Sequence, residues 1–455
     1  MTAVAPRVSR LGVGAWVLFD WSTQPFYTLI TTFVFAPYFA THLAATPVVG
    51  QSLWGYATAA AGAIIALLSP ILGAIADAAG RRKPWIAVFS AMLIVGALAL
   101  WFAAPGRDSA VMIALVAFVI ATVGVEFATA FNNAVMPDLV SEDRLGRLSG
   151  IGWATGYAGG LVSLVIVIGF LAANPETGKT LLGLAPILGL DAATFEGDRA
   201  VGPFSALWFL VFVLPFFLLT PDRAKAMPIG LAARQGLAQI ARTIGDLGRH
   251  ANIVRYLIAH MVYTDGLVAL FSVGGIYAAS TFGWSAIELG FFGILLTVTG
   301  AVGALVGGWL DDRVGSKLVI FAGLAVLVLS ALAILSIDAD HLLFVITVAP
   351  AAAGDGLFAS AGERAYLAIG AAIGAVAGPL QAASRTLMAR ISPRQSMTEF
   401  FGLYALSGKV TSFAGPLTVG LATAAAASQR VGVAVLVVFF GLGGFLLIGV
   451  KSGRG

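Results

Sequence analysis

Long apolar segments recur along the whole chain and leave few folds open to it. A helix that crosses the hydrocarbon core of a bilayer needs about 20 mostly apolar residues. Segments of that kind lie at 12–40, 52–76, 84–104, 109–134, 146–172, 203–220, 252–280, 286–310, 317–337, 364–388, 398–425 and 430–450. The sequence therefore predicts an all-α membrane protein with twelve transmembrane helices.

Composition agrees with this prediction and excludes several functions. Only 11% of the 455 residues are charged, against about 25% in soluble globular proteins. The net charge of +4 comes from loops, so no nucleic-acid partner is expected. Without cysteine the chain has no disulfide, thiolate nucleophile or thiolate-bound metal. The four histidines are scattered and no catalytic triad can be assembled. We therefore expect no metal site, no cofactor and no enzyme activity.

Basic residues predict how the chain is oriented. With the N-terminus in the cytoplasm, 19 Lys and Arg residues fall in loops and tails on that side, and five fall on the other. Because such an excess marks the cytoplasmic side, both termini are predicted to be cytoplasmic. The apolar run after Arg7 and Arg10 lacks a small-residue cleavage site and is interpreted as an uncleaved anchor. The Ala-, Gly- and Arg-rich composition favours a bacterial inner membrane.

The longest cytoplasmic loop, residues 221–251, divides the chain into two parts. Residues 1–220 and 252–455 are each expected to form a bundle of six helices. The loop itself is expected to form an amphipathic helix on anionic lipid.

A loop motif occurs once in each half. GAIADAAGRRK at 73–83 matches GWLDDRVGSK at 308–317 in the spacing of glycine, aspartate and glycine, and duplicated halves are a mark of secondary transporters. We expect each aspartate to accept hydrogen bonds from a neighbouring helix N-terminus, whose dipole favours a carboxylate. The second glycine permits a tight turn, and the basic residues hold the loop at the cytoplasmic face. The predicted gating residues are Asp77, Gly80, Arg81, Arg82, Lys83, Asp312, Gly315 and Lys317.

Few polar side chains lie within the apolar segments, and an ionised carboxylate in hydrocarbon costs several kcal/mol. At about 100° per residue they form two stripes: Asp20, Gln24, Tyr27 and Thr31 in the first, and Thr122, Glu126, Thr129 and Asn133 in the second. Further candidates are Asp265, Gln381, Arg385 and Lys409. We expect these residues to face a water-accessible cavity and to bind substrate or couple protons. Pro25 is expected to break its helix and to free carbonyls for a substrate.

Several candidates also have a purely structural interpretation. Asp20 and Lys409 could form an ion pair that fixes helix packing. Lys409 could instead bind a substrate carboxylate or neutralise Asp265. Arg385 lies near the cytoplasmic end of its segment and could snorkel to the surface. Asn132 and Asn133 are either substrate contacts or part of a helix end before Pro137.

Glycines recur at every fourth residue in three segments. They stand at 152, 156 and 160, at 303 and 307, and at 370, 374 and 378. Small residues at this spacing let membrane helices approach closely. These positions are therefore predicted to be packing surfaces and not a binding motif.

The loop motif resembles the signature of the major facilitator superfamily, G-x-x-x-D-x-x-G-R-R-[KR]. The first copy matches it fully, whereas the second has Ser316 and Lys317 in place of the arginines. Four other stretches narrow the resemblance: WVLFDWSTQPFYTLITTFVFAPYF at 16–39, NNAVMPDL at 132–139, GIGWATGYAGG at 150–160 and EFFGLYALSGKVTSFAGP at 399–416. Together they are similar to the vacuolar-effluxer-like (UMF) family, which includes the autophagy-related amino-acid effluxer of the yeast vacuole.

The resemblance implies two six-helix bundles whose first, fourth, seventh and tenth helices line a central cavity. It implies a secondary active transporter that exports amino acids or similar solutes by alternating access, with proton coupling left open. The alternatives are an exporter of drugs or other hydrophobic compounds, a sugar facilitator, and a non-transporting membrane sensor. The expected partners are a small-molecule substrate, protons and the lipid bilayer, and the chain is expected to act as a monomer.

Overall fold

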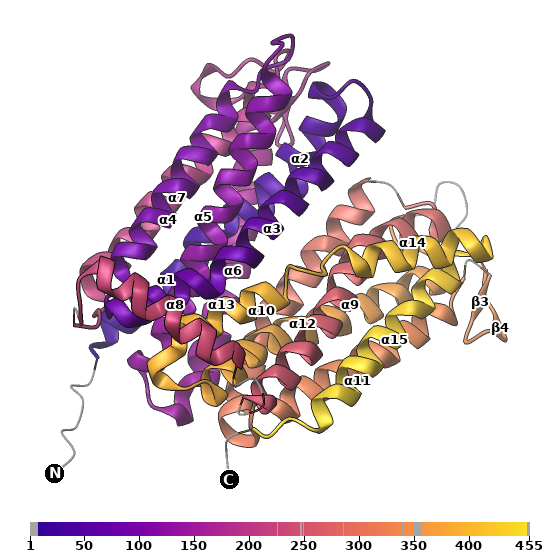
Figure 1. Cartoon of the computed structure of the whole chain (residues 1–455). Helices are drawn as coiled ribbons and strands as arrows, with labels where there is room; N and C mark the ends of the chain where they lie inside the picture. The colour runs from indigo at the N-terminus through magenta and orange to yellow at the C-terminus, as the bar shows by residue number, and fades with distance from the viewer. Residues whose placement is uncertain are drawn as a thin grey trace. The chain divides into compact units, whose positions relative to one another are not determined.

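Ten of the predicted segments form single long helices. The computed structural model describes residues 8–224, 226–245, 248, 250–284, 286–338, 340–349 and 356–452. Within these residues, ten helices are long and apolar enough to cross a membrane. They are built on α3 (Pro47–Ala79), α4 (Lys83–Ala99), α5 (Ala110–Leu139), α6 (Leu145–Ile166), α7 (Glu196–Leu219), α9 (Ala251–Phe282), α10 (Ala286–Val314), α11 (Ser316–Leu335), α12 (Ala361–Ile391) and α15 (Gln429–Ile448) (Figure 1).

Local sequence signals fix where several helices begin and end. Thr46 caps α3 by accepting a hydrogen bond from the backbone N–H of Val49, and α12 begins with a capping box. Gly80 ends α3 with a φ of 88°, a conformation that favours glycine. Pro137 lies inside α5, so the helix end suggested before that proline is wrong.

The first predicted segment, 12–40, is interrupted. It consists of α1 (Arg10–Pro25), the π-helix η1 (Phe26–Phe33), the short α2 (Phe35–Tyr38) and the π-helix η2 (Phe39–Leu43). Pro25 does not break the helix as predicted, because the chain continues in helical geometry through Phe26. Proline removes one hydrogen bond of the α-helix, and the hydrogen-bond spacing changes from α to π at the next residue. The irregular backbone lies later, at Val34.

The predicted segment 398–425 is interrupted as well. α13 (Met397–Ser407) ends in the turn 408–413, and α14 (Ala414–Ala426) follows. Gly408 and the β-branched and hydroxyl residues after it favour helix formation weakly. Pro416 has no N–H to donate to the carbonyl of Ser412. That both interrupted segments cross the membrane stays a prediction.

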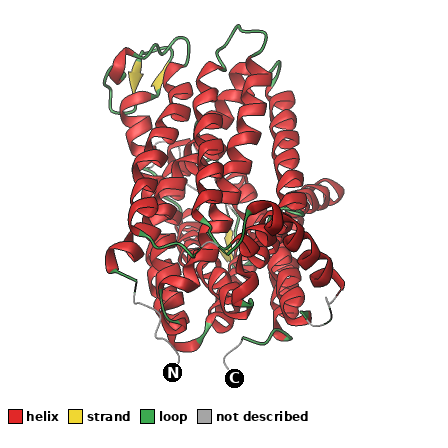
Figure 2. Ribbon diagram, turned by 60° about the vertical axis from the view of Figure 1, so that its left-hand side comes forward, coloured by secondary structure: helices red, strands yellow, loops and turns green. Residues whose placement is uncertain are grey.

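Short strands occur only in loops of the described chain, and helices make up almost all of the rest (Figure 2). After α6, β1 (Ala173–Asn174) pairs antiparallel with β2 (Lys179–Thr180). After α11, β3 (His341–Leu342) pairs antiparallel with β4 (Ile346–Thr347). These hairpins leave the α-helical class of the protein unchanged.

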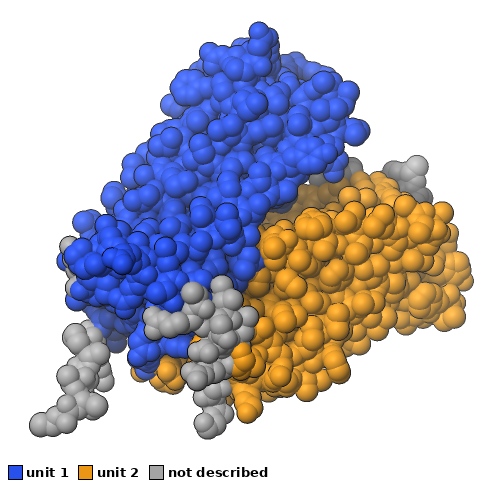
Figure 3. Space-filling view, viewed as in Figure 1, with its two compact units in different colours: residues 1–141, 155–242, 393–406 blue, residues 142–154, 243–392, 407–455 orange. Residues whose placement is uncertain are grey.

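The chain divides into two compact units (Figure 3). Unit 1 contains residues 1–141, 155–242 and 393–406, and unit 2 contains residues 142–154, 243–392 and 407–455. In unit 1, α4 packs against α5 and α7, and α1 packs against α7. In unit 2, α12 packs against α10 and α11, and α9 packs against α15. The start of α6 therefore groups with unit 2 and most of α13 with unit 1, while the domain limits 1–220 and 252–455 stay a prediction.

The glycines at four-residue spacing pack helices closely, as the sequence predicted. On α12, Gly370, Gly374 and Gly378 all lie against α10, where an added Cβ would overlap neighbouring atoms. On α6, Gly156 and Gly160 lie against α1 and η1. Close backbone approach of this kind is what small residues permit between membrane helices.

Part of the predicted linker loop forms the helix α8 (Ile229–Gly245). Its buried Ala232 packs with Ile75 and Ala79 of α3, and Gly236 lies against the backbone of Ile75. One face of α8 therefore contacts protein. Contact of the opposite face with anionic lipid, where Leu237 is exposed, stays a prediction.

Candidate functional site

The two predicted polar stripes of unit 1 meet at Tyr27 and Glu126. The Tyr27 hydroxyl, on η1, donates a hydrogen bond to Oε1 of Glu126 on α5 at 3.2 Å. The Tyr27 carbonyl in turn accepts the hydroxyls of Thr31 at 2.5 Å and Thr32 at 2.9 Å. A carboxylate inside a membrane protein is tolerated when polar groups accompany it. The structure therefore gathers members of both stripes into one polar cluster.

Asp20 and Gln24 lie one to two turns before Tyr27, beside α6. A Cβ at Gly156 would lie 3.3 Å from Nε2 of Gln24 and 3.5 Å from the carbonyl oxygen of Asp20. The side chain of Asp20 is half-buried. Gly156 therefore leaves room next to the stripe that a larger side chain would fill.

Pro25 exposes a backbone acceptor close to this stripe. Because proline has no N–H, the carbonyl of Trp21, four residues earlier, loses its α-helical donor. The indole N–H of Trp208 on α7 donates to that carbonyl at 3.1 Å, and the two indole rings stack with centroids 5.3 Å apart. The carbonyl that the proline frees thus accepts a hydrogen bond from another helix, and binding of a solute by carbonyls near Pro25 stays a prediction.

Asn133 and its neighbour Asn132 are both buried inside α5. The carbonyl of Asn132 accepts the indole N–H of Trp16 at 2.9 Å. The side-chain amide of Asn132 is fully buried and has no hydrogen-bond partner among the described residues. A buried amide in that condition costs roughly 1–3 kcal/mol, so Asn132 stays a candidate solute contact together with Asn133.

Unit 2 contributes Asp265 and Lys409. Asp265 lies on α9 with 4% of its surface exposed, and it forms no ion pair with any described residue. The pairing with Lys409 that the sequence left open is therefore not formed. Lys409 lies in the turn between α13 and α14. Its carbonyl accepts hydrogen bonds from the backbone N–H of Ser412 at 3.3 Å and from the Ser412 hydroxyl at 3.0 Å. The half-buried Lys409 ammonium is thus carried by irregular backbone.

Gln381 and Arg385 lie on α12. Nε2 of Gln381 donates to the carbonyl of Ala377 at 3.3 Å. Arg385 does not snorkel to the surface, because only 3% of it is exposed. Its guanidinium donates to the hydroxyl of Ser149 at 2.9 Å and to the carbonyl of Ser149 at 2.8 Å, at the start of α6. Arg385 therefore anchors this part of α6 within unit 2.

The first loop motif binds the start of α13. Asp77 accepts the Thr398 hydroxyl at 2.7 Å and the backbone N–H of Glu399 at 2.9 Å. The predicted contact between the aspartate and a helix N-terminus is thus confirmed. Gly73 permits the approach, since a Cβ there would lie 2.6 Å from the carbonyl oxygen of Thr398.

Arg82 is the buried cation of this loop, with 1% exposure. Its guanidinium lies 3.4 Å from the Asp77 carboxylate and 2.8 Å from that of Asp138, and its Nε donates to the Thr398 hydroxyl at 2.9 Å. Burial lowers the pKa of the Arg82 guanidinium below its usual value, and the Asp77 carboxylate offsets only part of that effect. The Asp138 carboxylate also accepts a bidentate pair of hydrogen bonds from the Arg223 guanidinium, at 2.7 and 2.8 Å. Sequence reasoning missed these partners because they come from distant segments.

The other basic residues of the loop act separately. Arg81 is exposed. The Lys83 ammonium donates to the carbonyl of Phe217 at 2.8 Å. Asp222, which the sequence analysis did not select, accepts the backbone N–H groups of Arg82 at 2.9 Å and Lys83 at 3.2 Å, and so caps α4.

The second loop motif binds the start of α6 in the same manner. Asp312 accepts the backbone N–H groups of Gly146 at 2.8 Å and Arg147 at 3.1 Å. Gly315, with a φ of 92°, makes the turn before α11. Lys317 instead donates to the carbonyl of Ile448, the last residue of α15, and to that of Val450. Both loop aspartates therefore meet the first turn of a helix.

The cation of the second network comes from a different chain position. Arg390 on α12 forms ion pairs with Asp311 and, at 3.6 Å, with Asp312. Arg390 precedes Glu399 by nine residues, as Asp138 precedes Arg147. The two halves therefore place opposite charges at matching positions. Arg390 therefore supplies in the second network the positive charge that Arg82 supplies in the first.

A buried hydrogen-bonded group in unit 2 was also missed by sequence reasoning. His260 on α9 contacts the Ser407 hydroxyl at 2.8 Å, at the last residue of α13. The Tyr263 hydroxyl contacts that of Ser384 at 2.7 Å, and the Tyr256 hydroxyl donates to the Ser384 carbonyl at 2.6 Å. These contacts tie α9 to the end of α13 and to α12.

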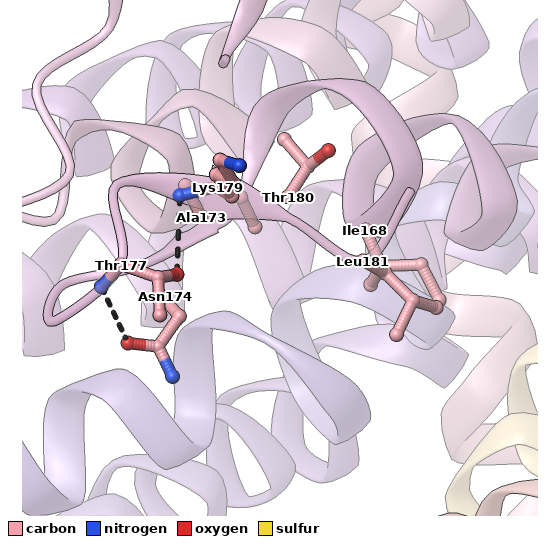
Figure 4. Close-up of a pocket in the computed structure, with 8 residues that line it drawn as sticks. Ile168, Ala173, Asn174, Thr177, Lys179, Thr180 and Leu181 are labelled. Atoms are coloured by element: carbon pink, nitrogen blue, oxygen red, sulfur yellow. Dashed lines mark hydrogen bonds between the residues drawn. The ribbon is translucent and has the colours of Figure 1, made fainter. Parts of the chain in front are cut away.

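A cavity of about 520 Å³ lies beside the β1–β2 hairpin (Figure 4). Its lining residues are Ile168, Ala172, Ala173, Asn174, Thr177, Lys179, Thr180 and Leu181. None of the predicted solute-binding residues lines this cavity. We therefore do not assign the solute site there.

Comparisons with known proteins agree on one family. A model of the family described as "Vacuole effluxer Atg22 like" matches residues 41–455. The Bacillus subtilis protein named "Uncharacterized MFS-type transporter YxiO" is 24% identical over 438 residues, which cover 94% of this chain and 92% of that protein. "Autophagy-related protein 22" of Cryptococcus neoformans is 27% identical over 297 residues, which cover 64% of this chain and 50% of that protein. The match thus spans about half the length of this fungal relative.

Solved structures share the fold. The human organic anion transporter MFSD10 (TETRAN) superposes with a TM-score of 0.69 at 15% identity, covering 96% of this chain and 99% of that one. The major facilitator superfamily transporter FucP, in its outward conformation, superposes with a TM-score of 0.70 at 15% identity, covering 97% and 98%. At this identity the likeness concerns the fold alone.

Proposed function

The chain belongs to the Atg22-like vacuole effluxer family of major facilitator superfamily transporters, and from that membership we propose that it exports a small polar solute, with free amino acids as the substrate class. It is a multi-pass membrane protein and a transporter, not an enzyme. The proposal includes twelve spans, halves at 1–220 and 252–455, and alternating access. It also includes a bacterial inner membrane with both termini cytoplasmic, which the distribution of basic residues supports.

The proposed substrate class rests on one observation. Acidic and basic side chains both lie within interrupted segments or beside other polar groups. Asp20 precedes the π-helix, Glu126 accepts the Tyr27 hydroxyl, and Lys409 lies in the turn between α13 and α14. A free amino acid carries an ammonium group that a carboxylate can bind and a carboxylate that an ammonium can bind. Interrupted helices recur at the solute sites of membrane transporters. We assign solute binding first to Asp20 and Lys409, and then to Gln24 and Asn133.

The two loop motifs support a gating role. Asp77 and Asp312 each hold the first turn of a helix through charge-assisted hydrogen bonds, which are worth about 1.5–3 kcal/mol each. A conformational change that released either helix start would have to break these bonds. We therefore propose that the loops stabilise one state of the transport cycle.

The experiment is counterflow exchange in proteoliposomes that contain the purified chain. We expect exchange of at least one labelled amino acid, reduced about tenfold or more in Asp20→Asn and in Lys409→Ala, because a lost charged contact is worth more than 1.4 kcal/mol. Asp338→Asn is the matched control, since Asp338 lies in a loop and pairs with Arg430 at the start of α15. Full exchange by both variants would refute the residue assignment. Exchange of sugars or of a hydrophobic dye, without amino acids, would refute the substrate class.

A further inference from the structure

Asp265 is a buried acid that the described structure leaves without a counter-charge. It lies mid-way along α9, within a helix apolar enough to span the membrane. Its Oδ1 atom is fully buried and makes no hydrogen bond to a described residue. Burying an ionised carboxylate without a partner costs several kcal/mol. The neutral acid avoids most of that penalty.

The interrupted segment of α13 and α14 lies directly against this acid. A Cβ at Gly415 would overlap the carbonyl oxygen of Asp265, so the start of α14 touches α9 there. The Thr411 hydroxyl of the turn lies near the carboxyl group, outside hydrogen-bond geometry. The Thr411 hydroxyl and the Oδ1 atom of Asp265 therefore both lack a hydrogen bond to a described residue, at a place where backbone hydrogen bonding is already irregular.

The surroundings of Asp265 contain few titratable groups, and none pairs with it among the described residues. On α9 itself, His260 contacts Ser407 and Tyr263 contacts Ser384 of α12. From α15, the ring of Phe440 lies against Gly266. The turn contributes Lys409, and α10 carries its acidic residues at its ends.

We propose that Asp265 is the residue that carries the coupling proton, protonated while the turn 408–413 packs against it and ionised when that packing opens to water. On release, the O–H bond of the carboxyl group breaks, the proton passes to water, and the carboxylate stays on α9. On the return step the carboxylate takes one proton from water on the other side of the membrane. The inference rests on the proposed transport function and assigns coupling to unit 2, apart from Asp20.

A proton fits this position better than a metal cation. The described residues contain no group of three or more acidic or histidine side chains that could hold a metal ion. Hard cations take about six or more oxygen ligands. Here one carboxyl group and one hydroxyl lie together, which is enough for a proton and too few for such an ion.

The first test needs no substrate. An apolar carbodiimide reacts with protonated carboxyl groups, and peptide mass spectrometry locates the adduct. Asp338 is the control acid: although burial raises its pKa, hydrogen bonds from the Asp340 amide and from Arg430 bring the pKa below its usual value. At pH 7 we expect at least about tenfold more adduct on Asp265 than on Asp338. A difference of one pKa unit changes the ratio of protonated to ionised acid about tenfold. Equal labelling, or suppression by sodium at constant pH, would overturn the proposal.

The second test measures coupling. In proteoliposomes, the ratio of solute accumulation driven by a pH gradient to counterflow exchange should fall at least about tenfold in Asp265→Asn. The control Thr418→Val, whose hydroxyl bonds within its own helix, should keep the wild-type ratio. An unchanged ratio in Asp265→Asn refutes the inference and leaves the proposed function standing. If the wild-type protein moves no solute, the proposed function fails, and the carbodiimide result still decides whether Asp265 holds a proton.

Discussion

The guanidinium of Arg82 joins a loop, the end of α5 and the start of α13 through Asp77, Asp138 and Thr398. Replacing it with methionine keeps much of the side-chain volume and leaves Asp77 buried without its cation. Breaking a buried ion pair in this way costs about 3–5 kcal/mol. We expect Arg82→Met to lower thermal stability by that order, measured by tryptophan fluorescence in detergent. The exposed neighbour Arg81→Met should change stability by less than about 0.5 kcal/mol. Equal effects of the two variants would contradict the assignment.

The hydrogen bond from Trp208 to the Trp21 carbonyl gives a second residue-level prediction. Trp208→Phe keeps most of the ring and removes the donor, which should cost about 1–3 kcal/mol because the carbonyl stays unsatisfied. Pro25→Ala restores an N–H to that carbonyl. In the Pro25→Ala background, Trp208→Phe should therefore cost less, with a coupling free energy of about 1 kcal/mol in a double-mutant cycle. A coupling energy of zero would mean that Pro25 does not create this acceptor.

Among the elements, the turn 408–413 interrupts a helix, and the proposed transport mechanism depends on that interruption. Gly408 has no positive φ, so Gly408→Ala is compatible with the backbone and should favour a continuous helix by about 0.5–1 kcal/mol. We expect higher thermal stability and slower solute exchange. Gly420→Ala on α14, where a Cβ would meet no other atom, should give the same stabilisation without slowing exchange. Equal exchange rates for both variants would show that the turn has no part in transport.

Hydropathy and spacing predict the long helices well and the interrupted ones poorly. An apolar run such as 12–40 or 398–425 satisfies a hydropathy window whether its backbone is continuous or not, because the window counts side chains. Pro25 did signal an irregularity, and its observed effects are a π-helix from the next residue and a hydrogen bond from Trp208 to the Trp21 carbonyl. The turn around Lys409 had only weak signals, namely Gly408 and a few β-branched and hydroxyl residues.

Across the whole molecule, the two loop networks share no residue, and each lies within one compact unit. Asp77→Asn and Asp312→Asn each weaken two hydrogen bonds to a helix start. Asp77→Asn also breaks the buried pair with Arg82 and should cost about 3–5 kcal/mol. Asp312→Asn should cost about 1–3 kcal/mol, because Arg390 keeps its pair with Asp311. In the double variant the losses should add to within about 0.5 kcal/mol, as expected for independent sites. The midpoints of thermal unfolding of the two single variants and the double variant test this. A larger deviation would mean that the networks are energetically coupled.

The sequence predicts the kind of partner that each loop aspartate has, and not its identity. The dipole argument requires a helix N-terminus, but nothing in residues 73–83 points to Glu399, more than 300 positions away. The same holds for Asp138 and Arg390, whose roles depend on which helix ends meet. The polar stripe of Asp20, Gln24 and Tyr27 was visible from helical periodicity alone, since its members lie within a few turns.

Because Asp138 and Arg390 carry opposite charges at matching positions, the loop of one half should not be able to replace the loop of the other. Grafting the first loop onto the second half would place alanine at the position of Asp311 and arginine at that of Ser316. Arg390 would then lose its Asp311 partner and face a second guanidinium. The reverse graft would leave Asp138 facing lysine in place of Arg82. After duplication, each loop has become matched to its own helix end, so a chimera must exchange both together.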